Sequence, residues 1–197
     1  VQLRLDTGTR VAFNDASGAA LTRGAVYVDS GANAGGAVAR FVLSTPDGDV
    51  RHLGTQYLAR VDGSALQLAV REGRVELSGS RGPVTANAGE LLSVSDGTVM
   101  RTMLAANAPE WGWVSDVTPP FSIEGRTVEE FLAWAARETG RRIVYATPEA
   151  ERQARTVTLS GTVQGLPPDQ AVAAVLATTS LEPAVGLDQI TVQQASR

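Results

Sequence analysis

The stretch Leu66-Gln67-Leu68-Ala69-Val70-Arg71-Glu72-Gly73-Arg74-Val75-Glu76-Leu77 decides the class of fold. Apolar and polar residues alternate on both sides of Glu72-Gly73, with the period of two that is typical of a half-buried strand. A turn signal between two such runs predicts a hairpin. Similar runs recur through residues 1–104 at intervals of roughly 8–12 residues, as in all-β folds. We therefore expect an all-β domain here, built as a roll, a sandwich or a solenoid-like stack. The other runs are 2–5, 10–13, 25–28, 40–43 and 92–94.

One short pattern occurs three times in this region: a glycine followed by alternating apolar positions. It begins at Gly24, Gly73 and Gly89. A glycine at such a position is typical of a tight corner before a strand that returns to the core. The pattern fits a repeated solenoid unit and glycines in ordinary hairpin turns equally well, and both interpretations stay open.

Composition excludes several kinds of chemistry. The 197 residues include no cysteine, a single histidine (His52) and 17 basic residues, all arginine, for a formal net charge of −4. Without cysteine the chain has no disulfide framework, thiolate zinc site or cysteine nucleophile. A single histidine excludes metal sites built on two imidazoles, and the acidic balance argues against a nucleic-acid interface. With 43% hydrophobic residues and no long apolar run, we expect a globular chain without a membrane span.

Residues 105–120 are predicted to form a linker. Prolines stand near both ends and no hydrophobic period runs between them, which indicates irregular chain. Trp111 and Trp113 lie inside this segment. Because tryptophan has a large apolar surface to bury, we expect the pair to join the two domains, and stacking on a ligand is the alternative.

The region 121–197 shows mixed periodicity. Thr127 and Glu130 form a capping-box pattern, and apolar residues then follow at helical spacing up to Gly140, a natural C-terminal stop. Trp134 lies about 100° from the centre of that apolar stripe, which places it at the flank of the buried face. Short alternating runs precede and follow the helix, at 121–123 and 143–145.

The same arrangement returns further along the chain. An extended run at 156–163 precedes a helix expected to begin at Pro167-Pro168-Asp169, where proline suits the first turn and the carboxylate suits the positive end of the helix dipole. Two closing strands are expected at 184–187 and 190–192. The region 121–197 is therefore predicted to be a small α+β domain made of two strand–helix–strand passes.

The sequence contains no motif typical of an active site. Walker loops, dinucleotide-binding glycines, nucleophile elbows and metalloprotease helices are absent from it. His52 lies in a predicted strand and is interpreted as structural. Asp47 and Asp49 flank a glycine, which is more typical of a hairpin turn than of a calcium site. We expect no catalytic residue, no metal site, no cofactor and no nucleic-acid partner.

Five residues are candidates for binding a partner or for contact between the domains. The tryptophans have large apolar surfaces. The arginine pair follows the first predicted helix and could contact an acidic partner, although simple solvation of both side chains is the plainer interpretation. The candidates are Trp111, Trp113, Trp134, Arg141 and Arg142.

Four motifs in the first region resemble a known family. In their order and spacing they are similar to the periplasmic portion of FecR-like proteins, the transmembrane regulators of iron uptake. Two positions depart from the family pattern: His52 stands where valine is usual, and Ala25 stands where glutamate is usual. The motifs are 39–48 (ARFVLSTPDG), 50–57 (VRHLGTQY), 70–77 (VREGRVEL) and 88–90 (AGE).

The second region resembles the short N-terminal domain shared by secretins and TonB-dependent transducers, called the STN domain. The matching segments are 121–123 (FSI), 139–140 (TG) and 159–161 (LSG). A β domain followed by this module is also the order found in FecR-like regulators. Together the two resemblances cover nearly the whole chain.

These resemblances imply a non-enzymatic signalling module in the periplasm, belonging to a single-pass inner-membrane protein. The implied partner is the N-terminal signalling domain of an outer-membrane TonB-dependent transporter. The signal would reach a sigma factor through a membrane helix and a cytoplasmic part, both expected upstream of Val1. An envelope scaffold or ligand-binding protein built from the same domains is the alternative.

Overall fold

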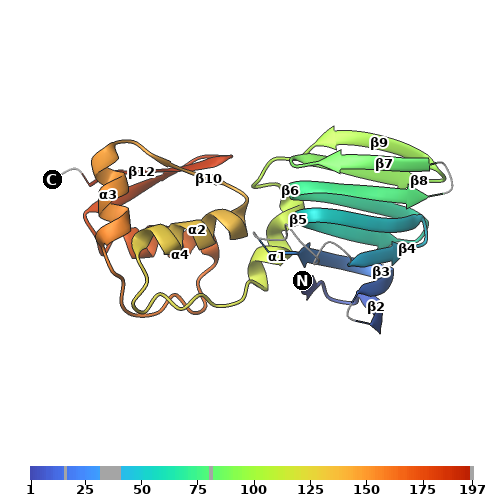
Figure 1. Ribbon diagram of the computed structural model, residues 1–197, viewed down its shortest axis with the longest axis horizontal. Helices are drawn as coiled ribbons and strands as arrows, with labels where there is room; N and C mark the ends of the chain where they lie inside the picture. The colour runs from blue at the N-terminus through green and yellow to red at the C-terminus, as the bar shows by residue number, and fades with distance from the viewer. Residues whose placement is uncertain (16, 32–40, 80–81, 196–197) are drawn as a thin grey trace. The chain divides into compact units, whose positions relative to one another are not determined.

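The protein divides into two compact units, Val1–Leu104 and Ala105–Arg197 (Figure 1). The computed structural model describes residues 1–15, 17–31, 41–79 and 82–195. The strand expected at 40–43 therefore begins, in the described part, at Val42, and Ala39 and Arg40 of the first family motif lie outside it.

The described residues of the first unit form one sheet of nine strands, so the predicted mostly β character of this half is confirmed. The main path is β1-β3-β4-β5-β6-β8-β9, with β2 added on β3 and β7 added on β6. Neighbouring strands are antiparallel except β3 and β4, which are parallel. The strands are β1 (Gln2–Leu5), β2 (Arg10–Asp15), β3 (Gly18–Asp29), β4 (Val42–Thr45), β5 (Gly48–Asp62), β6 (Ala65–Gly79), β7 (Gly82–Asn87), β8 (Glu90–Ser95) and β9 (Thr98–Met103).

The stretch 66–77 lies within the single continuous strand β6, so the hairpin predicted at Glu72-Gly73 is wrong. The strand bends there without reversing. Residues 65–69 pair with β8, whereas residues 74–79 pair with β7. Gly73 has φ +78°, and a Cβ at this position would lie 2.6 Å from the carbonyl oxygen of Gly54, so only glycine fits the bend.

A second long strand bends in the same way. In β3, residues 18–20 pair with β4 and residues 24–29 pair with β5. The change of partner falls at Gly24, which has φ +86°. Gly89, by contrast, lies in the turn between β7 and β8. Two of the three glycine patterns are thus corners inside strands, and the third marks an ordinary hairpin turn.

The bent strands surround one apolar core. Its members come from β3 to β8 and from the chain just before β4, and each is less than 8% exposed. The side chains are mainly aliphatic, and Phe41 and Tyr57 are the aromatic members. The core consists of Ala19, Leu21, Val26, Val28, Phe41, Leu43, Val50, Tyr57, Ala59, Val61, Leu66, Leu68, Val70, Val75, Leu77, Ala86, Leu92 and Val94.

His52 is buried at the side of this core. It lies in β5, as expected, with its ring 6.2 Å from that of Phe41 and 5.7 Å from that of Tyr57. Neither ring nitrogen has a hydrogen-bond partner among the described residues. Burial lowers the pKa of His52 below its usual value, and the positive N-terminus adds to this effect.

This burial makes the first unit sensitive to mild acid. Because the pKa of His52 is lower in the folded state than in the unfolded state, the unfolded chain takes up a proton first as the pH falls through about 6.5. We expect the melting temperature of this unit to fall between pH 7.5 and pH 5.5, measured by calorimetry. The variant His52→Val should lose most of that difference. An equal fall in the variant would contradict the assignment, since the chain has no other histidine.

The bend in β6 predicts a different cost for two glycine substitutions. Gly8 and Gly73 have similar positive φ values, +74° and +78°, but a Cβ on Gly8 would meet no atom within 4 Å. Gly8→Ala therefore measures backbone strain alone, whereas Gly73→Ala adds a clash with backbone. We expect Gly73→Ala to lower the free energy of unfolding by at least about 1 kcal/mol more than Gly8→Ala. Equal losses in urea unfolding would show that the clash is relieved.

The second unit packs helices against a three-stranded sheet with the order β10-β12-β11. Strand β10 is parallel to β12, and β11 is antiparallel to it. The predicted capping box of Thr127 and Glu130 is confirmed at the start of α2, and Gly140 ends this helix with φ +70°. The elements are η1 (Pro109–Trp111), α1 (Gly112–Asp116), α2 (Val128–Thr139), β10 (Arg142–Tyr145), α3 (Pro148–Thr156), α4 (Pro168–Leu176), β11 (Leu181–Val185) and β12 (Gln189–Gln194).

Three local expectations for this half are wrong. Residues 109–116, predicted as irregular linker, form η1 and α1. Residues 121–123 are not a strand, and the run at 156–163 contributes only an isolated bridge between Thr127 and Thr158, so neither of the two predicted strand–helix–strand passes begins with a strand. Helix α3 was not anticipated, because only Ala150 and Ala154 are buried on it and its composition is strongly polar.

The core of the second unit joins the helices to the sheet. Its members come from α2, α3 and α4, from β11 and β12, and from the chain segments between them. It is separate from the core of the first unit. The buried residues are Ile123, Val128, Phe131, Leu132, Ala135, Ala150, Ala154, Leu159, Val163, Ala171, Val172, Val175, Leu176, Leu181, Ile190 and Val192.

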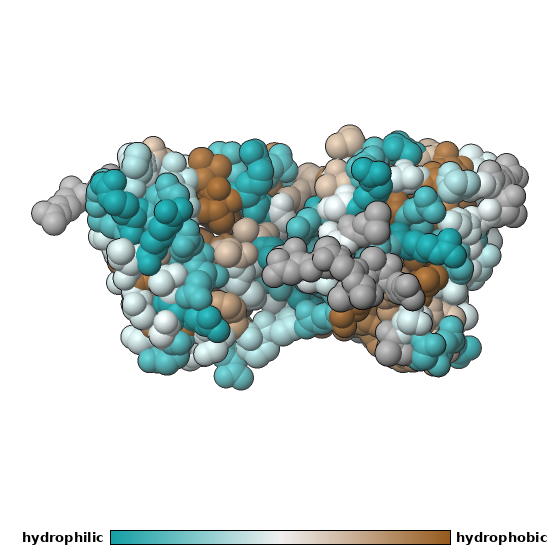
Figure 2. All heavy atoms as spheres, viewed as in Figure 1, coloured by the Kyte–Doolittle hydropathy of each residue, from teal (hydrophilic) through white to brown (hydrophobic). Residues whose placement is uncertain are grey.

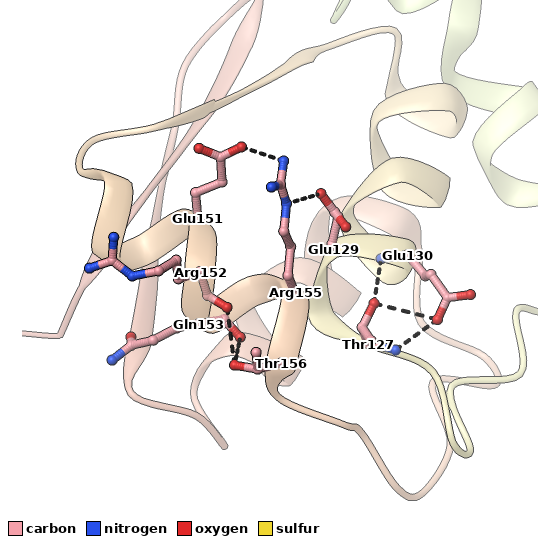
Figure 3. A network of polar contacts seen from close by, with 8 residues as sticks. All are labelled: Thr127, Glu129, Glu130, Glu151, Arg152, Gln153, Arg155 and Thr156. Atoms are coloured by element: carbon pink, nitrogen blue, oxygen red, sulfur yellow. Dashed lines mark hydrogen bonds and ion pairs between the residues drawn. The ribbon is translucent and has the colours of Figure 1, made fainter.

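Charged side chains connect α2 to α3 at the surface (Figure 3). Arg155 Nε donates to Glu129 Oε1 at 3.0 Å, and Arg155 Nη2 donates to Glu151 Oε1 at 2.6 Å. All three side chains are at least 40% exposed, so the pairs add little stability. Figure 2 shows a largely hydrophilic surface around α3. This helix is held mainly by its two buried alanines.

Candidate interaction site

The three-stranded sheet has a covered face and an open face. Ile190 and Val192 of β12 point into the core beneath the helices. Because successive strand residues point to opposite faces, Thr191 and its register partners Val144 and Ala184 lie on the other face. None of these three is among the core residues that the structure describes. Within the described part of this unit, core side chains therefore cover one face of the sheet only.

One edge of this sheet is poorly suited to pairing. The N–H of Gly186 donates to Gln189, and the N–H of Ala195 donates to Ser180, so positions 181, 183 and 185 of β11 face away from β12. Position 183 is proline, which has no N–H to donate. The N–H of Leu181 already donates to Thr179 Oγ1 at 3.0 Å. Two of the three outward donors of β11 are thus absent or occupied.

The other edge is open. The N–H of Arg142 donates to Asp188 and that of Ala146 donates to Val192, so the backbone groups of Ile143 and Tyr145 face away from β12. No strand of the described residues pairs with this side of β10. An exposed strand edge of this kind can add a strand from another chain.

Tyr145 keeps a neutral phenol at this edge. Its side chain is half-buried, and this burial raises its pKa above the usual value. The nearby carboxylates of Glu129 and Glu151 raise the pKa further, while Arg155 opposes them. Because β10 contains no acidic residue and its tyrosine is neutral, the edge strand has no negative charge at neutral pH.

The predicted arginine pair is split by the structure. Arg142, the first residue of β10, is exposed, whereas Arg141 is 8% exposed. Arg141 Nε donates to the carbonyl oxygens of Gly186 at 2.9 Å and Leu187 at 3.3 Å, and its Nη1 is ion-paired with Asp169. Arg141 thus ties the turn between β11 and β12 to the start of α4, which is a structural task. Arg142 is the member of the pair that a partner could reach.

This difference predicts opposite outcomes for two neighbouring substitutions. Arg141→Ala should lower the free energy of unfolding of the second unit by about 1–2 kcal/mol, because two carbonyls and Asp169 lose a charged donor. Arg142→Ala should change it by less than about 0.5 kcal/mol, as for an exposed side chain. Tryptophan fluorescence in urea measures this, since all three tryptophans lie in this unit. Equal effects would contradict the clamp role of Arg141.

Trp134 lies at the flank of the buried face of α2, as the helical spacing predicted. It is half-buried and packs against the core. Its ring stacks on Phe121, with centroids 5.2 Å apart and an interplanar angle of 22°, and lies 5.6 Å from Phe131. The cluster places an aromatic wall beside the loops that precede α2 and α4. No sequence pattern had singled out Phe121 as its partner.

The other two tryptophans do not join this cluster. Trp111 in η1 is 4% exposed, and its Nε1 donates to the carbonyl oxygen of Ala105 at 3.3 Å. Trp113 in α1 is half-buried, and its Nε1 is buried without a hydrogen-bond partner among the described residues. Their expected role in joining the two domains stays a prediction.

The residues considered for catalysis and metal binding are dispersed. Asp49 accepts a hydrogen bond from Ser44 Oγ at 2.8 Å, as in an ordinary hairpin. The described residues contain no group of three or more histidine and acidic side chains that could hold a metal ion. No described helix is long and apolar enough to span a membrane.

The fold defines a two-unit protein, with a bent β roll followed by an open-faced α+β unit. The sequence profile of the family described as FecR protein matches residues 1–76. The resemblance of the first unit to FecR-like proteins is therefore confirmed over residues 1–76.

Solved structures show a weaker likeness. Two crystal structures from Parabacteroides distasonis, each described as a “putative anti-sigma factor”, are 14% identical to this chain and cover 98% of it. The alignments span 90% and 86% of those chains, with TM-scores of 0.45 and 0.41. No curated protein sequence shows a significant match.

Proposed function

We propose that this chain is the periplasmic signalling module of a FecR-like regulator. In this proposal it has no enzymatic activity and binds the N-terminal signalling domain of an outer-membrane TonB-dependent transporter. The FecR match over residues 1–76 carries the proposal, because it associates the first unit with a family of signalling regulators. The second unit would be an STN-like domain, because its motifs resemble those of the STN domain.

The open edge of β10 supports docking as the mode of action. A strand from the transporter domain could donate to and accept from the backbone of Ile143 and Tyr145, extending the sheet to four strands. Arg142 lies at the start of that edge and could pair with a carboxylate on the partner. Pro183 makes the opposite edge a poorer site.

The remaining steps lie outside this chain. A membrane helix and a cytoplasmic part belonging to the same regulator would pass the signal to a sigma factor. Within the chain, Trp111 and Trp113 are proposed to join the two units rigidly. Binding of a partner at the second unit would then be transmitted to the first unit.

Binding and its location can be tested together. We expect the N-terminal domain of a TonB-dependent transporter encoded beside this gene to retain the 197-residue chain in a pull-down. In the complex, hydrogen exchange of the Ile143 and Tyr145 amides should slow by at least about tenfold, because strand pairing protects backbone donors. The amides of Leu181 and Val185 on β11 provide the internal reference.

Each outcome is informative. Binding with protection on β11 instead of β10 would contradict the proposed edge but keep the partner. Binding of none of the neighbouring transporter domains would overturn the partner and favour the envelope scaffold. The same transporters without their N-terminal domains are the control and should not bind.

A further inference from the structure

The second unit contains a cavity of about 490 Å³ beside Trp134. This volume falls within the range of roughly 300–1,000 Å³ typical of small-molecule sites. It is lined by Ser115 and Asp116 at the end of α1, by the loop segments 118–121 and 163–167, and by Trp134 from α2. All lining residues belong to the second unit, and none lies in the sheet that carries the proposed docking edge. The cavity is therefore a separate feature of this unit.

One wall of the cavity is aromatic and rigid. Phe121 and Trp134, the stacked pair, both line it, and Pro119 and Pro167 continue the apolar surface. Proline rings and a stacked indole have little conformational freedom, so little entropy is lost when a ligand packs against them. Trp134 Nε1 makes no hydrogen bond to a described residue and is not buried, so it remains available as a donor.

The rim supplies hydrogen-bonding groups that the protein itself does not use. The side chains of Ser115, Asp116 and Gln164 line the cavity. Asp116 and Gln164 are exposed and Ser115 is half-buried. None of these three side chains is hydrogen-bonded to another described residue. A hydroxyl, a carboxylate and an amide together can both donate and accept.

The charge of the lining narrows the chemical class of the ligand. No arginine lines the cavity, and Asp116 is its one charged side chain among the described residues. Phosphate and carboxylate ligands need basic partners or clustered N–H donors and are disfavoured here. A single carboxylate is too few for a metal ion. A ligand with an apolar face for the aromatic wall and several hydroxyls for the rim matches both surfaces.

We propose that this cavity binds a neutral oligosaccharide. The carbon-bound hydrogens of one sugar ring pack against the Phe121–Trp134 wall, and its hydroxyl groups donate to Asp116 and exchange hydrogen bonds with Gln164 and Ser115. Trp134 Nε1 donates to a hydroxyl or ring oxygen. This function is independent of transporter docking.

The tryptophan side chains allow a direct test by NMR. The ¹⁵N-labelled 197-residue chain is titrated separately with N,N′,N″-triacetylchitotriose and with maltotriose, two neutral trisaccharides. We expect saturable shifts of the Trp134 indole N–H with at least one of them at concentrations up to about 20 mM, an ordinary range for weak binding. The indole signals of Trp111 and Trp113, which do not line the cavity, should stay in place.

Rim variants test the location without disturbing the aromatic cluster. Asp116→Ala and Gln164→Ala should each weaken binding about fivefold, the effect of one hydrogen bond. Leu187→Ser is the matched control, because Leu187 is 64% exposed in the same unit but lies outside the cavity lining. Its affinity should equal that of the unaltered chain.

Three results would overturn the proposal. The first is the absence of a saturable Trp134 shift with either sugar. The second is saturable binding that both rim variants leave unchanged. The third is a shift caused only by a decaproline peptide, run in parallel, which would assign the aromatic wall to polyproline recognition instead. Loss of transporter binding would not affect any of these readouts.

Discussion

The first unit depends on strands that bend and continue. Strand β6 pairs with β8 along one half and with β7 along the other, and Gly73 stands between the halves. A straight fifteen-residue strand would carry its apolar side chains past the end of a small core. The bend returns them to it, so residues as distant as Leu66 and Leu77 share one cluster. Because the bend brings the backbone at Gly73 against that of Gly54, no side chain can be placed there.

The second unit is organised around its central strand β12. One neighbour, β11, is poorly suited to further pairing because Pro183 has no N–H, and its turn is fixed to α4 through Arg141. The other neighbour, β10, is short and lacks a partner on its outer side among the described strands. The asymmetry gives this sheet one edge for intermolecular pairing.

The FecR match and the two candidate sites involve different parts of the chain. The match covers residues 1–76 of the first unit. The β10 edge offers backbone hydrogen bonds to a protein strand, whereas the cavity beside Trp134 offers an aromatic wall and free polar side chains. The two sites lie on different elements of one unit, so both could be occupied at once.

The sequence by itself determined the features that depend on near neighbours in the chain. Alternating runs identified the β half, the pattern of Thr127 and Glu130 located the start of α2, and helical spacing placed Trp134 at the flank of the core. The FecR motifs were also recognised from residues that are close together in the chain. Each of these signals arises within a few residues, where steric and hydrogen-bonding preferences act directly.

Only the tertiary structure decided what depends on distant contacts. Whether Gly73 reverses the chain or bends it depends on the strands that pair on either side, and these lie elsewhere in the sequence. Arg141 and Arg142 are identical residues side by side, yet one is buried because the carbonyls of a distant turn face it. Phe121 reaches Trp134, and Pro183 blocks one sheet edge, for the same reason: packing and strand order bring these residues into place.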